Sequence, residues 1–389
     1  MSLKKCKYVC FFAFVCMLSL IFIEPVVSVS AFENLTPNSK SSILVEYGTG
    51  EILAENNSTE KMPIASVTKL MTILLTLESI KNGKLDLEQS VIASENSAGM
   101  GGSQVFIDAN AEYEVKNLLK AVIVASANDA SVCLAETIAG SEENFVQLMN
   151  KKAGELGLEN TNYQNCTGLP APSQYSCAKD VATIMKELVK YPLYFEISGI
   201  WMEDFEHPSG RVTGMANTNK LIKFYNGCDA GKTGSTNEAG FCLASTAKRA
   251  DMRLISVVLG AKTSKERFAD ASNLLNWGFN NYQSVKVVDK TTNLAENINL
   301  QKAKENNLVL NAEEDFYAIS KKGESSQFEV NMEIPEKLNA PLKAGDVVGK
   351  LLITKNGEVK KEIAVVVCQD VQALGFFGTF KNILSKWNL

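Results

Sequence analysis

The spacing of apolar residues separates the first part of the chain into extended and helical stretches. Two apolar stretches flank the turn residues Gly48-Thr49-Gly50 and predict a β-hairpin that begins near Ser41. After Ser66 the apolar period lengthens to three or four residues and ends at Gly83. This pattern predicts a buried helix whose inner face carries Leu70, Ile73, Leu74, Leu77 and Ile80.

The middle of the chain continues with helical patterns and then returns to strands. Helices are predicted for residues 117–139, with an interruption at Ser126, and for residues 142–156, 180–189 and 267–279. Strands are predicted for residues 241–244 and 254–259. Helices in the middle with strands at both ends predict one α/β (α+β) domain, residues 32–282, whose first and last strands pair in an antiparallel sheet.

The pattern of hydrophobic and polar residues changes again after Tyr282. Short β-type runs alternate with turns such as Gly345-Asp346 and Asn356-Gly357, which predicts a small all-β domain over residues 283–371. The runs are Val285–Val288, Leu308–Leu310, Phe328–Ile334, Val347–Ile353 and Ile363–Val367.

The last segment, residues 372–389, carries an amphipathic pattern. Its apolar residues lie three or four apart and include Leu374, Phe377, Phe380, Leu384 and Trp387. With Lys381 and Lys386 between them, this stripe predicts attachment to the outer face of the cytoplasmic membrane. The alternatives are packing on the β domain and a dimer seam.

The first 31 residues have the organisation of a secretory signal peptide. Three lysines precede an apolar run from Tyr8 to Ile23, and small residues lead to a predicted cleavage after Ala31. A retained membrane anchor is the alternative. We therefore expect an exported, extracytoplasmic protein.

Composition narrows the possible partners. The net charge is −5 and no basic stripe with interleaved aromatic residues occurs, so no nucleic acid is expected to bind. Six of the nine cysteines follow the predicted signal peptide, and no Cys-x-x-Cys pair occurs. We expect single buried thiols rather than a disulfide framework, and no metal or other cofactor.

Three short motifs carry the chemistry. They are Ser66-x-x-Lys69, Ser126-x-Asn128 and Lys232-Thr233-Gly234, and this order is that of penicillin-binding proteins and β-lactamases. A serine at a helix start lies near free N–H groups, and Lys69 falls on the same helix face. Burial and the second cation of Lys232 would lower the pKa of Lys69 so that it takes the serine proton.

The remaining motif residues suit the other steps of an acyl transfer. Ser126 can relay a proton to the leaving amine, and Asn128 can hold the substrate amide. Lys232 and Thr233 suit a carboxylate. His207 is the sole histidine, so a Ser-His-Asp triad or a histidine-based zinc site would have to depend on it alone. Its polar, proline-flanked position predicts an exposed structural residue instead.

Longer stretches around the motifs resemble the serine D-alanyl-D-alanine carboxypeptidases, the low-molecular-mass penicillin-binding proteins. The resemblance covers roughly residues 41–282, with the β-rich tail less specific. It rests on residues 100–104, 167–176, 217–221 and 232–243.

The resemblance implies the fold, mechanism and partners. It implies the penicillin-binding/β-lactamase-like transpeptidase fold with a helical subdomain. Ser66 attacks the bond between two terminal D-alanines of a peptidoglycan stem peptide, and the oxyanion lies between the N–H groups of Ser66 and Ser235. It also implies that β-lactam antibiotics acylate Ser66, and that Gly234 and Arg267 belong to the substrate-binding residues. For Arg267 a salt bridge at a helix start is the alternative.

Other functions share parts of this pattern. A serine β-lactamase of the commonest type needs a Glu-x-x-Leu-Asn loop, which does not occur between Ser126 and Lys232. A transpeptidase or endopeptidase would use the same motifs on another acceptor or bond. A non-catalytic penicillin-binding wall protein is opposed by the intact Ser66, Lys69, Ser126 and Lys232.

Overall fold

The computed structural model describes residues 34–295, 298–305, 307–324 and 328–375. The predicted signal peptide and residues 376–389 of the amphipathic segment lie outside these residues. Within them, no helix is long and apolar enough to cross a membrane.

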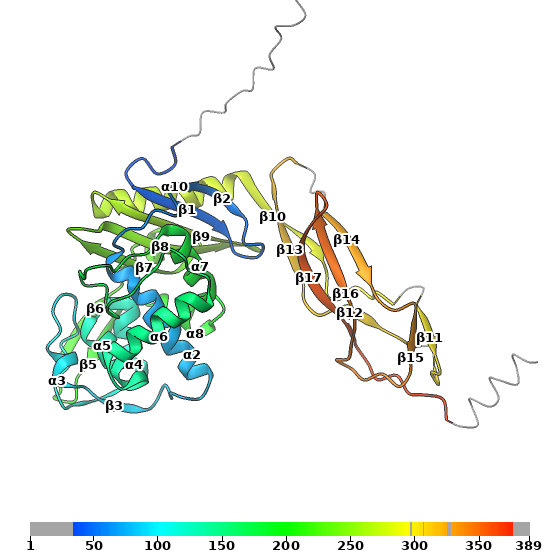
Figure 1. Cartoon of the computed structure of the whole chain (residues 1–389), viewed down its shortest axis with the longest axis horizontal. Helices are drawn as coiled ribbons and strands as arrows, with labels where there is room; N and C mark the ends of the chain where they lie inside the picture. The colour runs from blue at the N-terminus through cyan, green and yellow to red at the C-terminus, as the bar shows by residue number, and fades with distance from the viewer. Residues whose placement is uncertain (1–33, 296–297, 306, 325–327, 376–389) are drawn as a thin grey trace, which may run out of the picture. The chain divides into compact units, whose positions relative to one another are not determined.

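A five-stranded antiparallel sheet forms the centre of the first domain (Figure 1). Its order is β2-β1-β9-β8-β7, so β7 is an edge strand. β1 pairs with β9 from Ser41 opposite Leu259 to Glu46 opposite Leu254, which confirms the predicted pairing of the first and last strands. The strands are β1 (Ser41–Glu46), β2 (Ile52–Asn56), β7 (Cys228–Thr236), β8 (Gly240–Arg249) and β9 (Met252–Ala261).

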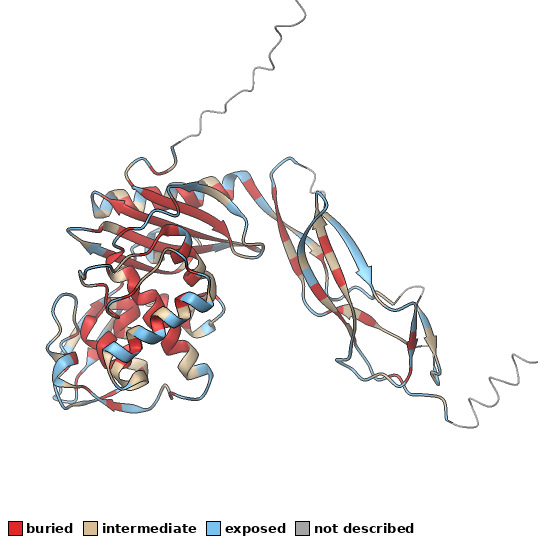
Figure 2. Ribbon diagram, viewed as in Figure 1, coloured by how far each residue is buried: buried red, intermediate tan, exposed pale blue. Residues whose placement is uncertain are grey.

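Helices cover both faces of this sheet. α10 (Ser264–Asn281) packs on β8 and β9, and α7 (Ala178–Leu188) packs on β9 and β1 from the other side. Because β9 is covered on both faces, all of its residues except Arg253 are buried, as Figure 2 shows for the inner strands. This explains why its sequence is a continuous apolar run rather than an alternating one.

The predicted helices are confirmed to within a few residues. Those other than α7 and α10 form a helical subdomain beside the sheet. α10 begins three residues before the predicted start because Thr263 caps it, its hydroxyl accepting from the N–H of Glu266 at 3.2 Å. The remaining elements of this domain are a 3₁₀ turn (Ala65–Thr68), α2 (Lys69–Lys81), β3 (Ser90–Ile92), α3 (Glu95–Ala98), β4 (Glu112–Glu114), α4 (Val115–Lys120), a π-helical turn (Ala121–Ala125), α5 (Asn128–Ala139), α6 (Glu142–Glu155), α8 (Pro192–Ser198), β5 (Met202–Glu206), β6 (Val212–Ala216) and α9 (Leu221–Phe224).

The second domain is all-β, as predicted, and has a hydrophobic core of its own that includes Leu310, Ile353 and Val365. Its largest sheet has the order β12-β17-β16-β14. The predicted runs do not include β11, β13 or β15, of which β13 is the longest and lies at Phe316–Lys321. The other strands are β10 (Tyr282–Val288), β11 (Asn299–Gln301), β12 (Leu310–Ala312), β14 (Phe328–Glu333), β15 (Lys337–Asn339), β16 (Val347–Lys355) and β17 (Glu358–Val367).

Candidate active site

The three sequence motifs meet where the edge strand β7 contacts the 3₁₀ turn that precedes α2. Ser66 lies in the 3₁₀ turn that leads into α2, and Lys69 is the first residue of that helix. The Nζ of Lys69 lies 3.2 Å from the Oγ of Ser66. The spacing of three residues therefore brings the serine and the amine into hydrogen-bond distance, as predicted.

Two further acceptors surround the amine of Lys69. Its Nζ lies 2.6 Å from Oδ1 of Asn128 and 2.7 Å from the carbonyl oxygen of Thr167. Lys69 is fully buried. In the neutral amine, two N–H bonds directed at Asn128 and Thr167 leave the lone pair for the hydroxyl of Ser66. This is the arrangement that a general base requires.

Lys232, in the third motif, forms a hydrogen bond with Ser126 of the second motif. Its Nζ donates to the Oγ of Ser126 at 2.7 Å and to the carbonyl of Thr233 at 2.8 Å. Ser126 follows the π-helical turn and has left-handed backbone angles, φ 63° and ψ 31°. Such conformations are unfavourable for a residue with a side chain, and they cluster at functional sites. The interruption predicted at Ser126 is thus a break that directs its hydroxyl at Lys232.

Burial shifts the pKa of both lysines. It lowers the pKa of Lys69 from 10.5 to about 7, against the opposing influence of Cys166 and Asp129. Burial also holds the pKa of Lys232 well below its ordinary value, with further lowering by the charges of Lys69 and Arg267. A lysine with a pKa near 7 is available as a base at neutral pH.

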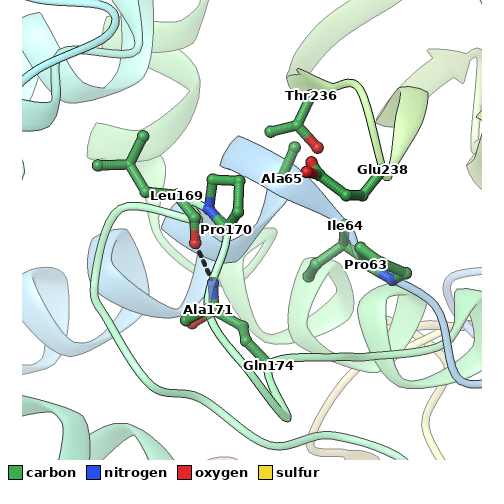
Figure 3. Close-up of a pocket in the computed structure, with 10 residues that line it drawn as sticks. Pro63, Ile64, Ala65, Leu169, Pro170, Ala171, Gln174, Thr236 and Glu238 are labelled. Carbon is green, nitrogen blue, oxygen red and sulfur yellow. Dashed lines mark hydrogen bonds between the residues drawn. The ribbon is translucent and has the colours of Figure 1, made fainter.

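The loop that supplies the Thr167 carbonyl is fixed by its own side chains. Oδ1 of Asn165 accepts from the N–H groups of Thr167 and Gly168 at 3.2 and 2.7 Å. The amide of Gln174 donates to the carbonyl of Leu169 at 3.0 Å (Figure 3). In the sequence this loop is recognisable only through the family resemblance, because a backbone carbonyl leaves no sequence signal.

Two glycines allow this loop and strand β7 to approach the serine turn. A Cβ on Gly168, whose φ is +85°, would lie 2.0 Å from the carbonyl oxygen of Ala65. A Cβ on Gly234 would lie 2.9 Å from the backbone nitrogen of Ser66. Lys232 and Gly234 are two residues apart on β7 and share a face, so the strand that directs Lys232 at Ser126 also passes against Ser66. The glycine of the third motif is therefore required by packing.

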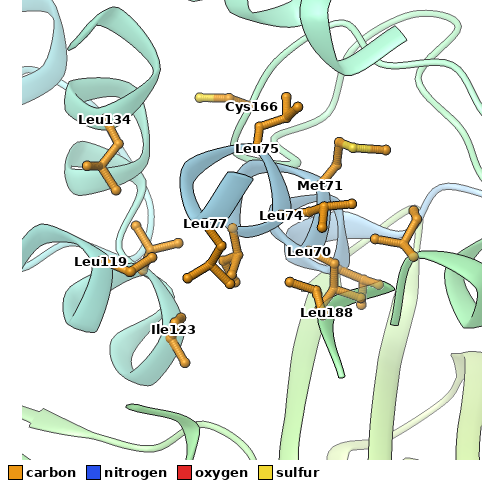
Figure 4. Packing of buried hydrophobic residues seen from close by; sticks show 14 of the residues in the cluster. Leu70, Met71, Leu74, Leu75, Leu77, Leu119, Ile123, Leu134, Cys166 and Leu188 are labelled. Atoms are coloured by element: carbon orange, nitrogen blue, oxygen red, sulfur yellow. The ribbon is translucent and has the colours of Figure 1, made fainter. Parts of the chain in front are cut away.

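The buried helix α2 fixes the position of the serine turn. All residues from Lys69 to Leu77 are buried. Figure 4 shows Leu119, Ile123 and Leu134 on one side of this helix and Leu188 on the other. Each such side chain contributes about 1.5–3 kcal/mol when fully buried, so the helix cannot shift without a large loss of stability.

The remaining predicted substrate-binding residues also lie around β7. Thr233 is buried and Ser235 is exposed on either side of Gly234. The amide nitrogen of Asn128 donates to the carbonyl of Gly101 at 2.7 Å. Together with its contact to Lys69, this engages both ends of the Asn128 amide within the protein.

Arg267 contacts β7 and β8 through their backbone. Its Nη1 donates to the carbonyls of Gly234 at 3.1 Å and Cys242 at 3.3 Å. Among the described residues it has no ion pair with a carboxylate, so the alternative of a salt bridge at the helix start does not hold. Its Nε is buried and has no hydrogen-bond partner within the described ranges of the chain.

His207 is buried, and the prediction of an exposed residue was wrong. Its Nδ1 lies 3.1 Å from the hydroxyl of Tyr113, and its Nε2 lies 2.9 Å from the hydroxyl of Thr213. The polar residues next to His207 in the sequence suggested exposure. In the folded chain the rings of Tyr113 and Phe205 cover the imidazole. These contacts give His207 a structural role in the β5–β6 hairpin.

The cysteines follow the expectation with one exception. All six cysteines of the described residues are free, and five of them are buried, whereas Cys368 is exposed. Within the part of the chain that the structure describes, no group of three or more His, Cys, Asp or Glu residues is placed to hold a metal ion.

Comparison with known families gives two matches along the chain. Residues 28–263 match the D-alanyl-D-alanine carboxypeptidase family. Residues 282–373 match the C-terminal domain of penicillin-binding protein 5.

Individual relatives agree with these matches. A D-alanyl-D-alanine carboxypeptidase of Bacillus subtilis, DacF, is 39% identical over 354 residues, which cover 91% of each chain. A crystal structure of PBP3 from Streptococcus pneumoniae, titled a peptidoglycan synthesis regulatory factor, superposes with a TM-score of 0.74 at 30% identity. It covers 86% of this chain and 99% of that one. Penicillin-binding protein 5 of Haemophilus influenzae superposes with a TM-score of 0.69 at 33% identity, over 86% of this chain and 98% of that one.

Proposed function

Because the chain belongs to the family of serine-type D-alanyl-D-alanine carboxypeptidases, we propose that it removes the terminal D-alanine of peptidoglycan stem peptides through an acyl-enzyme on Ser66. The observation that carries this proposal is the contact of the Lys69 Nζ with the Ser66 Oγ at 3.2 Å, while Asn128 and Thr167 accept from the same amine.

The first step is acylation. As the Ser66 Oγ bonds to the carbonyl carbon of the penultimate residue, its proton passes to the lone pair of Lys69 and the carbonyl electrons move onto oxygen. The N–H groups of Ser66 and Ser235 stabilise this oxyanion, and the loss of one such donor costs on the order of 3 kcal/mol. The passage of β7 against Ser66 supports this pairing of donors.

In the second step the C–N bond breaks and D-alanine leaves. The proton that Lys69 took from Ser66 passes to the leaving nitrogen by way of the Ser126 hydroxyl, which Lys232 holds, so that Lys69 is neutral again. Water then attacks the ester carbon, with Lys69 again as base, and the acid product leaves Ser66 free. Because a penicillin presents a strained amide to the same groups, it acylates Ser66 covalently.

The carboxylate of the terminal D-alanine binds at Lys232 and Thr233. An entering carboxylate restores the charged form of Lys232, whose pKa burial and neighbouring cations hold low. Arg267 supports this subsite by holding the carbonyl of Gly234 and by its positive charge. In this proposal Arg267 positions β7 rather than touching the substrate.

The test is release of D-alanine from an acylated L-lysyl-D-alanyl-D-alanine peptide. Wild type should release D-alanine, and Ser66→Ala should release none and should not be labelled by a fluorescent penicillin. Hydrolysis of penicillin with steady turnover would instead favour the β-lactamase. Labelling without D-alanine release from any peptide would favour the non-catalytic wall protein.

A competition between acceptors separates the remaining alternatives. With an added amine, a transpeptidase would form the amide product in preference to the free acid. With cross-linked peptides, an endopeptidase would release the cross-linking strand faster than terminal D-alanine. We expect the free acid and terminal D-alanine to dominate.

We also propose that the mature protein acts outside the cytoplasm at the outer face of the cytoplasmic membrane. The sequence pattern of residues 1–31 supports export, and the apolar stripe with Lys381 and Lys386 supports attachment to anionic headgroups.

A further inference from the structure

A pocket adjoins the serine turn on the side away from Lys232. The open space within it, together with solvent at its mouth, is about 360 Å³. Figure 3 shows Leu169 and Pro170 on one side of it, with Thr236 and Glu238 facing them. The lining residues are Pro63, Ile64, Ala65, Gly168, Leu169, Pro170, Ala171, Gln174, Thr236 and Glu238.

The position of this pocket along β7 relates it to a particular part of the substrate. Gly234 passes against Ser66, so the proposed mechanism puts the attacked carbonyl there and the terminal carboxylate toward Lys232. The acyl part of the peptide must therefore extend the other way, toward Thr236. The two residues from Gly234 to Thr236 span about 7 Å, and so do two residues of an extended peptide, here the penultimate D-alanine and the residue before it. The pocket thus receives the residue that precedes the two D-alanines.

The chemistry of the pocket favours an alkyl chain with a positive end. Pro63, Ile64 and Pro170 give it apolar walls. The hydroxyl of Thr236 accepts from the N–H of Ala239 at 3.0 Å, and the amide of Gln174 is engaged within its own loop.

Glu238 differs from these neighbours because its carboxylate has no partner in the part of the chain that the structure describes. Its side chain is exposed, and among the described residues it forms no ion pair or side-chain hydrogen bond. An aliphatic side chain can lie along the apolar walls while its ammonium group meets this carboxylate.

We propose that Glu238 is a specificity residue that recognises an aliphatic amine on the residue preceding the two D-alanines. The proposal rests on the carboxypeptidase function proposed above. Glu238 does not take part in bond breaking, so it should act on the choice of peptide rather than on the acylation chemistry itself.

The experiment compares three acylated peptides of the form Xaa-D-Ala-D-Ala. Xaa is lysine, Nε-acetyl-lysine or norleucine, so that the charge is separated from the length of the side chain. In wild type, kcat/KM for D-alanine release should be about two- to fivefold higher for lysine than for norleucine. This preference should shrink as the salt concentration rises.

The variants test whether Glu238 causes the preference. Glu238→Gln should bring the lysine-to-norleucine ratio close to one, and Glu238→Lys should invert it. Glu196→Gln removes an exposed carboxylate on α8, outside the pocket, and should keep the wild-type ratio.

Each failure is distinguishable. If no peptide releases D-alanine, the proposed function is wrong. If all peptides release it at equal rates in wild type, or if Glu238→Gln slows all three in the same proportion, the function stands and the assignment of Glu238 is overturned.

Discussion

The Nζ of Lys69 lies 2.7 Å from the carbonyl oxygen of Thr167, a residue 98 positions further along the chain. Lys69 begins a buried helix, whereas Thr167 belongs to a loop held by Asn165 and Gln174. The orientation of the proposed base is therefore set by two elements distant in sequence. Changes in either element should affect acylation, and for different reasons.

Lys69→Arg should lower the rate of acylation by penicillin by about 10²- to 10⁴-fold. Arginine keeps a positive charge but does not lose its proton in a protein, so it cannot accept the proton of Ser66. Fluorescent penicillin labelling over time measures the rate, and thermal unfolding checks that the variant folds. Labelling at the wild-type rate would leave Lys69 with an electrostatic role only.

The pH dependence of acylation should follow the same amine. Because burial lowers the pKa of Lys69 to about 7, its basic form accumulates as the pH rises through this value. The second-order acylation rate should rise with pH to a plateau and fall about tenfold per unit on the acid side of the pKa. Stopped-flow acylation with a chromogenic β-lactam measures it. A rate that does not change from about pH 5 to 9 would contradict the base assignment.

Gly168→Ala should slow acylation by displacing the loop that supplies the Thr167 carbonyl. The new Cβ would meet the carbonyl of Ala65 at 2.0 Å, in a backbone conformation with φ +85° that side chains disfavour. The loop must shift, and displacing the Thr167 carbonyl by about 1 Å would slow acylation on the order of 10²-fold. Penicillin labelling and thermal unfolding measure the two effects.

A matched glycine provides the control for this variant. Gly154 lies in α6 with nothing within 4 Å of an added Cβ. Gly154→Ala should leave acylation unchanged and stabilise the helix by up to about 1 kcal/mol. Equal acylation rates in both variants would show that the loop position does not matter to the base.

The fold was predictable where local pattern and burial agree. The apolar run Leu254–Leu259 predicts a strand, which the structure then covers on both faces, and the period of Leu70 to Ile80 predicts the buried helix. Strands β11 and β15 were missed because three residues are too few to show an alternating pattern, whereas β13, with Phe316, Tyr317 and Ile319, carries a strand signal that was overlooked. His207 was misplaced because its burial depends on Tyr113, which lies far away in the sequence.

Only the parts of the site formed by the side chains of short sequence motifs could be predicted. The contact between Ser66 and Lys69 follows from helical spacing, which a sequence displays directly. The Thr167 carbonyl is a backbone group from a distant loop, and any residue type could supply it. The assignment of Asn128 to the substrate stays a prediction, and the structure adds the contacts of its amide with Lys69 and Gly101, which only the folded chain sets.

In the C-terminal segment, backbone hydrogen bonds of the described residues determine where a truncation should begin. The carbonyl of Gln372 accepts from the N–H of Lys304 at 2.8 Å, and the N–H of Leu374 donates to the carbonyl of Lys302 at 2.7 Å. These hydrogen bonds join residues 372–374 to the β domain, so the deletion should begin after Gly375.

A mature protein, from residue 32 on, should sediment with vesicles that contain anionic lipid, and the form lacking residues 376–389 should remain in solution. Attachment through apolar area and two lysines is modest and reversible, so salt should weaken it. Charge reversal at both Lys381 and Lys386 should reduce binding to anionic vesicles without changing the unfolding temperature. Equal sedimentation of the full and truncated forms would exclude the anchor. A truncated form that unfolds at a lower temperature would instead show that the stripe packs on the β domain, and a change from dimer to monomer in analytical ultracentrifugation would identify a dimer seam.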